Sequence, residues 1–240
     1  MSLASLRVLG LLAAAATLAT FGCAEGTDDV IATGGVSGVA VECNHRAELT
    51  GDPLYTFAED IEGFTKEAYA ADPPYKNLSN SGDNPYDGRV VVRWSDAEGI
   101  DGEPGVIELS APFGGYQELV DLQLNLDEPV DWSDKTIRAY VKIVDGFVPS
   151  RTDPGGGYVF VKTGTAFVFG RGAWTKLWPE CQGEWIEFAI HIAVPDEANA
   201  GYDPTDVRSI GVQVSTGDGP IVPEDLPTPA TVYIDSFTIE

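Results

Sequence analysis

The stretch "GGYVFVKTGTAFVFGRGAWTKLW", residues 156–178, decides the fold class through its alternation of side chains. In its "YVFVK" segment, two valines fall on one face of an extended strand, and Tyr158, Phe160 and Lys162 fall on the other. Its "FVF" segment repeats the pattern, with one valine opposite two phenylalanines. Because a period of two is typical of half-buried strands, the stretch predicts a pair of β-strands.

The rest of the chain predicts the same class of structure. The 240 residues are 43% hydrophobic and include 27 Gly and 16 Pro, which favours one core with many turns. Short apolar or alternating runs occupy residues 54–58, 89–94, 105–111, 118–126, 136–144, 158–162, 165–170, 184–192, 209–215 and 230–239. None of the segments between these runs has the 3.6-residue period of a helix. We therefore predict an all-β protein, a β-sandwich of the jelly-roll kind.

The predicted strands differ on their two faces. In residues 136–144, Ile137 and Val141 alternate with Arg138 and Tyr140. Because charged side chains are rarely buried without a partner, we expect the aliphatic faces to form the core. Several aromatic side chains then point outward beside bases and amides, and a contiguous exposed aromatic patch usually marks a binding site.

This mixture of side chains suits the recognition of a sugar. Aromatic rings cover the apolar C–H face of a pyranose, and amides and bases bind its hydroxyls. In one alternative, loops such as residues 145–157 cover the outer aromatics, or these form a second small core. The predicted ligand-binding residues are Arg138, Tyr140, Tyr158, Phe160, Lys162, Phe167, Phe169, Trp174, Trp178 and Gln213.

The first 50 residues predict export and a tether. One arginine precedes the apolar run "VLGLLAAAATLATF", which has the length of a signal peptide and is short for a membrane span. Residues 1–22 are thus predicted to be a signal peptide, and residues 23–50 a flexible, glycine-rich tether before a β-sandwich domain over residues 51–240. The "GC" at Cys23 resembles a bacterial lipoprotein signal, although Thr20 stands where Leu is usual. Ordinary secretion, with cleavage after Ala24, is the alternative.

The three cysteines fit an oxidising compartment. Cys23 is the predicted lipidation site, which anchors the protein to a bacterial membrane of the cell envelope, the outer membrane being favoured. Cys43 and Cys181 remain as an even pair and are predicted to form a disulfide. In the alternative, both are unpaired thiols.

The charge of the chain limits its partners. With 38 Asp and Glu against 14 Lys and Arg, the formal net charge is −24, which disfavours nucleic acid and anionic lipid as ligands. Half of the basic residues nevertheless lie close together in the sequence, so an anionic glycan is one possible ligand. These residues are Lys135, Arg138, Lys142, Arg151, Lys162, Arg171 and Lys176.

Four segments in order resemble a family of known modules. They are "YTFAEDIEGF", "VDWSDKTIRAYVKI", "VKTGTAFVFGRGAWTKL" followed by "GEWIEFAIHI", and "DVRSIGVQVSTGDG" followed by "ATVYIDSFTIE". The order is similar to that of the galactose-binding-like β-sandwich of non-catalytic bacterial carbohydrate-binding modules, over roughly residues 53–240. The resemblance implies binding of a polysaccharide or oligosaccharide without turnover, by a monomer.

The resemblance also implies a structural calcium ion near the first and last strands. The matching carboxylates are Asp235 and, in "AEDIE", Glu59 or Asp60, because Ala58 stands where the family has Glu. Calcium takes six to eight oxygen ligands, some of which are backbone carbonyls. Alternatively, Asp235 only ends a ladder or caps a turn.

Two other functions stay open at this stage. The chain has two histidines, without metal-ligand spacing, and no nucleophile-elbow or phosphate-loop motif. No catalytic residue is therefore predicted, but a jelly-roll polysaccharide hydrolase or lyase is one alternative. A surface adhesin that binds a protein through the same aromatic face is the other.

The cysteine pairing leads to a direct prediction. Unreduced protein that starts at residue 24 should show no titratable thiol after denaturation, since Cys43 and Cys181 are joined. A thiol-reactive reagent measures this, with reduced protein as the control. Two titratable thiols would exclude the disulfide.

Overall fold

A computed structural model describes residues 47–72, 74–84, 89–114, 117–146, 155–216 and 230–240. The predicted signal peptide and most of the tether, with Cys23 and Cys43, lie outside these residues. Within the described part, no helix is long and apolar enough to cross a membrane.

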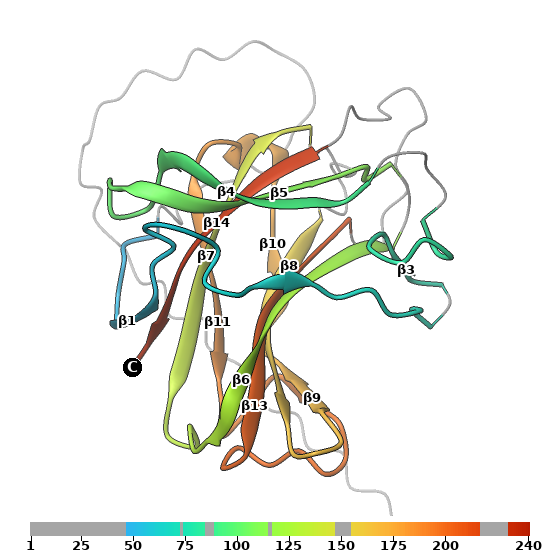
Figure 1. Cartoon of the computed structure of the whole chain (residues 1–240), viewed down its shortest axis with the longest axis vertical. Coiled ribbons are helices and arrows are strands. Elements are labelled where there is room, and N and C mark those ends of the chain that lie inside the picture. Colours follow the sequence, from blue (N-terminus) through green and yellow to red (C-terminus); the bar gives the residue numbers. More distant parts are fainter. Residues whose placement is uncertain (1–46, 73, 85–88, 115–116, 147–154, 217–229) are drawn as a thin grey trace, which may run out of the picture. The chain divides into compact units, whose positions relative to one another are not determined.

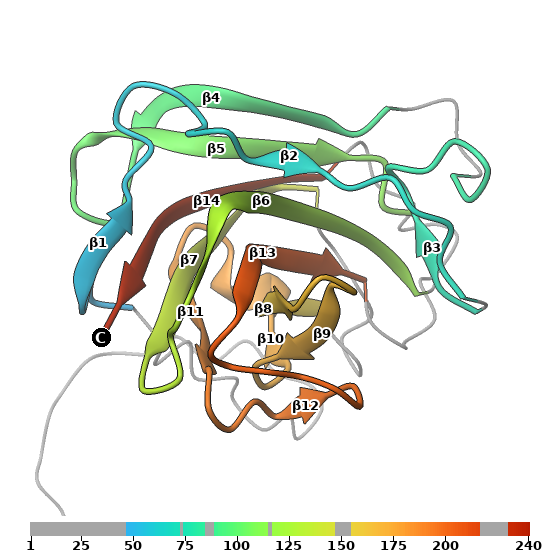
Figure 2. The same cartoon turned by 60° about the horizontal axis from the view of Figure 1, so that its bottom comes forward.

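One layer of the domain is a six-stranded antiparallel sheet. Its strand order is β11–β7–β14–β5–β4, and β1 pairs with β14. Figure 2 shows β4 and β5 side by side in this layer. The strands are β1 (Asp52–Tyr55), β4 (Val91–Glu98), β5 (Pro104–Ala111), β7 (Thr136–Asp145), β11 (Trp185–His191) and β14 (Ala230–Ile239).

The other layer is an eight-stranded sheet, antiparallel except where β3 pairs with β6. Its order is β12–β9–β8–β13–β6–β2, with β10 beside β8 and β3 beside β6. Figure 1 shows its long strands β6 and β13 side by side. The strands are β2 (Thr65–Lys66), β3 (Lys76–Asn77), β6 (Glu118–Val130), β8 (Gly156–Thr163), β9 (Val168–Arg171), β10 (Thr175–Lys176), β12 (Glu197–Ala198) and β13 (Val207–Ser215).

The prediction of a β-sandwich is confirmed. From β5 to β8, successive strands lie in alternate sheets, as in a jelly roll. Each predicted run overlaps a strand, and β14 has the predicted bounds. The short strands β2, β3, β10 and β12 were not predicted, nor was a 3-10 helix at Pro179–Cys181.

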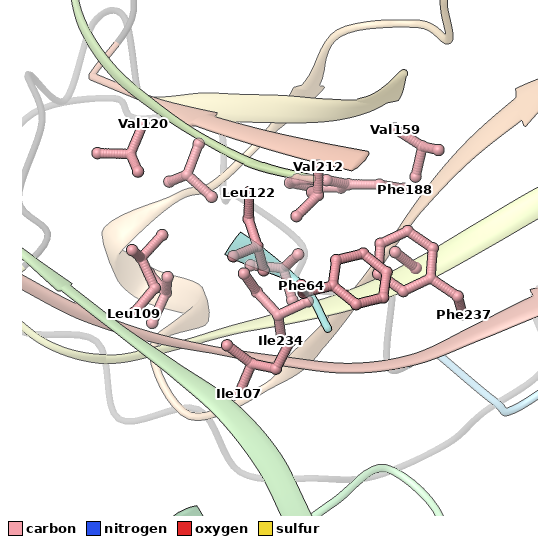
Figure 3. Packing of buried hydrophobic residues seen from close by; sticks show 14 of the residues in the cluster. Phe64, Ile107, Leu109, Val120, Leu122, Val159, Phe188, Val212, Ile234 and Phe237 are labelled. Carbon is pink, nitrogen blue, oxygen red and sulfur yellow. The ribbon is translucent and has the colours of Figure 1, made fainter. Parts of the chain in front are cut away.

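The core lies between the inner faces of the two sheets (Figure 3). As alternation predicted, the aliphatic faces of β7, β8 and β13 supply fully buried side chains, including Val141, Val159 and Val212. At one side of the core, the rings of Phe64 and Phe237 stack with centroids 4.8 Å apart. The burial of these apolar surfaces is the main force that holds the sheets together.

On the outer face of the eight-stranded sheet, the Phe160 ring closely approaches the backbone of β13. It projects from β8, and its register partner on β13 is Gly211. A Cβ atom at position 211 would lie 2.4 Å from Cζ of Phe160 and 2.5 Å from the carbonyl oxygen of Leu122. Phe160 can therefore be fully buried on an outward face only because its neighbour has no side chain.

Two more aromatic rings on this sheet depend on glycine in the same way. A Cβ atom at Gly156 would lie 2.8 Å from Nε1 of Trp174, and one at Gly170 would lie 2.3 Å from the ring of Tyr202. The abundance of glycine among the aromatics of residues 156–178 thus has a structural reason, since rings lie across strands where the backbone leaves space for them.

The 3-10 helix contains Cys181, which is disulfide-bonded and buried. Its predicted partner, Cys43, lies outside the described residues, so this pairing stays a prediction. At the start of the described residues, the Ala47 N–H donates to the carbonyl oxygen of Trp185 (3.1 Å). Trp185 is the first residue of the edge strand β11.

The close contact between Phe160 and Gly211 leads to a prediction about stability. Gly211→Ala should lower the free energy of unfolding by about 1–3 kcal/mol, because the new methyl group overlaps both the ring and a neighbouring backbone carbonyl. Urea denaturation measures the change. Gly82→Ala is the control, since its Cβ would approach only the side chain of Asn80, at 3.2 Å. Equal stability of the two variants would contradict this explanation.

Candidate functional site

A cleft of about 780 Å³ lies on the outer face of the eight-stranded sheet. Strands β6, β8, β9 and β13 form its floor, and the segment between β2 and β3 supplies a wall. The cleft mixes rings, amides and charges. Its lining residues are Glu67, Tyr69, Ala71, Asp72, Tyr75, Leu119, Asp121, Tyr158, Lys162, Phe169, Arg171, Trp174, Lys176, Glu197, Asn199, Gln213 and Ser215.

The floor is ordered by the strand register. Tyr158 on β8, Gln213 on β13 and Asp121 on β6 are direct neighbours across three strands and form one row. The next row has Phe160 and Gln123 on either side of Gly211. Antiparallel pairing therefore places polar groups from distant parts of the sequence on one surface.

Asp121 is the buried centre of the floor, with only 3% of its surface exposed. Tyr69 Oη donates to its Oδ2 atom (2.8 Å), and Gln213 Nε2 donates to its Oδ1 atom (2.8 Å). Burial raises the pKa of Asp121 to about 6, although the hydrogen bonds from Gln213 and Tyr69 and the charge of Lys162 oppose this. The same burial, together with the Asp121 charge, raises the pKa of Tyr69.

Lys162 lies beside this centre and is held by two acceptors. Its Nζ atom donates to Glu67 Oε2 and to Gln123 Oε1, the latter at 2.9 Å. Only 14% of the lysine side chain is exposed. The ammonium group is therefore neutralised and fixed inside the cleft.

Arg171 is held in a similar way at the β9 side. Its Nη2 atom donates to Glu197 Oε2 (2.6 Å), and its Nη1 atom lies 3.4 Å from Asp196 Oδ2. The guanidinium carbon lies 5.0 Å from the centroid of the Tyr158 ring, a distance suited to a cation–π contact.

Three aromatic rings form one continuous side of the cleft. The Tyr158 centroid lies 6.1 Å from that of Phe169 and 6.0 Å from that of Trp174, both in edge-to-face geometry. Trp174 and Phe169 are partly exposed, whereas Tyr158 is nearly buried. These contacts fix the ring planes before any ligand arrives.

The opposite wall is the segment of residues 67–75, which contributes Tyr69 and the exposed Tyr75. At its start β2 pairs with β6, and at its end β3 pairs with β6 in parallel. The Nδ2 atom of Asn77 also donates to the carbonyl oxygen of Glu67 (2.9 Å), which ties the two ends together.

This wall was not predicted from the sequence. "KEAYAADPPYKN" has no alternation, and its proline pair argues against a strand. The two tyrosines so close to a proline pair were the available signal, since ordered loops with aromatic side chains often bind ligands.

Half of the predicted ligand-binding residues line the cleft. They are Tyr158, Lys162, Phe169, Trp174 and Gln213. They come from β8, β9, the segment before β10, and β13. Whether they bind a sugar stays a prediction.

The other predicted residues do not line the cleft, so the structure does not bring all ten together, and their role in binding stays a prediction. Arg138 and Tyr140 lie on β7 of the other sheet, where Arg138 pairs with Glu240 (2.8 Å) and the Tyr140 hydroxyl accepts a hydrogen bond from the Thr50 N–H (3.0 Å). Strand parity could not reveal this, because it does not say in which sheet a strand lies.

Three predicted aromatic residues lie outside the cleft lining for local reasons. Phe160 is fully buried beneath Phe169, with ring centroids 5.6 Å apart. Phe167 has 49% of its surface exposed, but it sits in the turn between β8 and β9, outside the cleft lining. Trp178 packs against the core, and Lys176 lies over its ring.

The predicted calcium ligands do not form a group. Among the described residues, no three His, Cys, Asp or Glu side chains are placed to hold a metal ion. Asp235 Oδ2 accepts the Ile100 N–H (2.7 Å), and its Oδ1 accepts the Ser236 hydroxyl (3.2 Å), so this carboxylate fixes a loop. Glu59 and Asp60 are exposed, and Asp60 accepts the Glu62 N–H.

Calcium binding by the protein stays a prediction. A melting temperature that rises with calcium and falls with a chelator would show that the protein binds calcium. The ligands would then have to include groups other than Asp235, Glu59 and Asp60.

No family model matches the chain, and no curated protein matches it. Among solved structures, an exo-beta-agarase is 12% identical with a TM-score of 0.47, over 79% of this chain. The present chain spans about a quarter (24%) of that agarase.

Several of the matched structures are carbohydrate-binding modules. The family 11 module of a cellulosomal cellulase of Clostridium thermocellum is 10% identical with a TM-score of 0.45, over 80% of this chain and 94% of that one. A family 22 xylan-binding domain of Paenibacillus barcinonensis is 16% identical with a TM-score of 0.41, over 81% and 97%. At these scores the likenesses assign no activity to the chain.

The burial of Asp121 makes a prediction about pH. Its pKa is higher in the folded protein than the ordinary 3.8, so the folded state binds the proton more tightly than the unfolded state does. The free energy of unfolding should therefore fall as pH rises from 4 to 6, by up to about 3 kcal/mol from this group.

Asp121→Asn should remove this part of the slope, while Asp134→Asn, in which a largely exposed carboxylate is changed, should leave it. Urea denaturation from pH 4 to pH 7 measures both slopes. Identical slopes for wild type and Asp121→Asn would contradict the burial effect. The pKa of Asp235 is also raised to about 6, so this group accounts for the pH dependence of stability that remains in Asp121→Asn.

Proposed function

We propose that the cleft on the eight-stranded sheet binds carbohydrate without cleaving it. The observation that supports this most directly is the side formed by Tyr158, Phe169 and Trp174 facing a floor of fixed amides and charges. Aromatic rings offer surfaces for the C–H faces of sugars, and the polar groups offer donors and acceptors for hydroxyls.

The geometry suits an extended ligand. The cleft runs over four strands, from Tyr75 and Tyr69 on one wall to Trp174 on the other. Its rings and polar groups are held by one another, so binding loses little side-chain entropy. The order of sequence segments that resembles carbohydrate-binding modules supports the same proposal.

Binding is favoured over catalysis by the state of the cleft carboxylates. A pKa of about 6 would suit Asp121 as a general acid, but both of its oxygens accept protein hydrogen bonds and its side chain is buried. Glu67 is paired with Lys162, and Glu197 with Arg171. A glycosidase needs two carboxylates that flank the scissile bond with access to it.

The cellular location is part of the proposal and rests on the N-terminal sequence. We propose that Cys23 is lipidated and that the tether holds the domain at the bacterial cell envelope, with plain secretion as the alternative. Metabolic labelling with a fatty acid tests this, because label that persists in Cys23→Ser would exclude this attachment point.

The main test compares Trp174→Ala with wild type on a broad polysaccharide panel, using residues 24–240. We expect wild type to bind at least one polysaccharide and the variant to bind it at least about tenfold more weakly, because an aromatic contact surface is lost. Affinity electrophoresis or calorimetry measures binding, and reducing ends are assayed in the same samples.

Phe167→Ala is the matched control, since it removes an exposed aromatic ring outside the cleft. Equal losses in both variants would contradict a site at the cleft. Release of reducing ends would place the protein among the hydrolases, and unsaturated products would indicate a lyase. No binding to any polysaccharide would favour a protein ligand for this surface.

A further inference from the structure

We propose that the ligand of this cleft is a neutral glycan and that the ion pairs of the cleft exclude uronic acids and sulfated sugars. This inference rests on the proposed function and narrows it. It also replaces the anionic glycan that the clustering of basic residues in the sequence suggested.

The charges that line the cleft favour this choice. Four carboxylates (Glu67, Asp72, Asp121 and Glu197) face three bases (Lys162, Arg171 and Lys176), so the lining has a net charge of −1 when all are ionised. A lining without positive excess offers no general attraction for a carboxylate or sulfate on a sugar.

The two bases on the floor are already satisfied. Glu67 and Gln123 hold Lys162, and Glu197 and Asp196 hold Arg171. An anionic sugar would have to displace these carboxylates or accept a position beside them. In a partly desolvated cleft, a like charge without a compensating partner is costly.

The third base differs in position. Lys176 is exposed, and its ammonium lies 5.4 Å from the centroid of the Trp178 ring, which is not part of the cleft lining. It lies at the rim, where solvent and salt screen its charge. One screened rim base does not offset a repulsive floor.

The whole protein adds to the effect at longer range. A formal net charge of −24 repels an anionic polymer before it reaches the cleft, at low salt above all. A neutral polymer meets no such barrier, and its hydroxyls can donate to the carboxylates and accept from Lys162, Arg171 and Gln213.

The test uses pairs of soluble polymers that share a backbone and differ in charge. They are hydroxyethyl and carboxymethyl cellulose, dextran and dextran sulfate, and neutral xylan and its glucuronic-acid-substituted form. At pH 7 and low salt, we expect wild type to bind the neutral member of at least one pair about tenfold or more tightly than its charged partner.

Glu67→Gln provides a test in the opposite direction. It keeps a side-chain oxygen next to Lys162 but removes the charge that neutralises it, so binding of the charged member should rise several-fold at low salt and return to the wild-type level in high salt. Glu103→Gln is the matched control, because it removes one exposed negative charge in a loop of the other sheet.

The outcomes separate the two proposals. Preference for a charged polymer by wild type overturns the neutral-glycan inference and leaves carbohydrate binding intact. Neutral preference without a gain in Glu67→Gln, or with an equal gain in Glu103→Gln, overturns the role of the floor ion pairs. No binding to any polymer of either kind overturns the proposed function and the inference together. Neutral preference with a gain specific to Glu67→Gln supports the inference.

Discussion

The close approach of aromatic rings to glycine backbone is the constraint on which the site depends. Phe160 rests on Gly211, and Trp174 rests on Gly156. These contacts turn an outward sheet face into a dense floor without covering it by another layer. Other features of the cleft build on this floor, because Phe169 contacts Phe160, Tyr158 contacts Trp174, and Arg171 lies over the Tyr158 ring.

Strand periodicity made most of the sandwich predictable. The period of two in "TIRAYVKIV" and "SIGVQVS" identified the core side chains, because each face of a strand meets a single environment. Sheet membership was not predictable in this way. Arg138 and Lys162 look alike in sequence, yet β7 and β8 lie in different sheets, and only pairing between distant segments decides this.

The interior of the site was less predictable than the fold. The two hydrogen-bond partners of Asp121 lie 52 and 92 positions away from it in the sequence. No local sequence pattern predicts such hydrogen bonds. The sequence clustering of bases was misleading for the same reason, since Glu67 lies 95 residues from Lys162 and cancels its charge. A composition count along the chain cannot replace charge pairing in space.

The way in which residues 67–75 are attached has an evolutionary consequence. Two ladders of two residues each, both on β6, anchor the two ends of this wall, and none of its described side chains belongs to the main hydrophobic cluster. Changes in its length or composition therefore leave the hydrophobic core largely undisturbed while they reshape one wall of the cleft. The fold separates the part that must be conserved for stability from the part that can diversify, so related chains can acquire new ligand preferences by exchanging a single short segment.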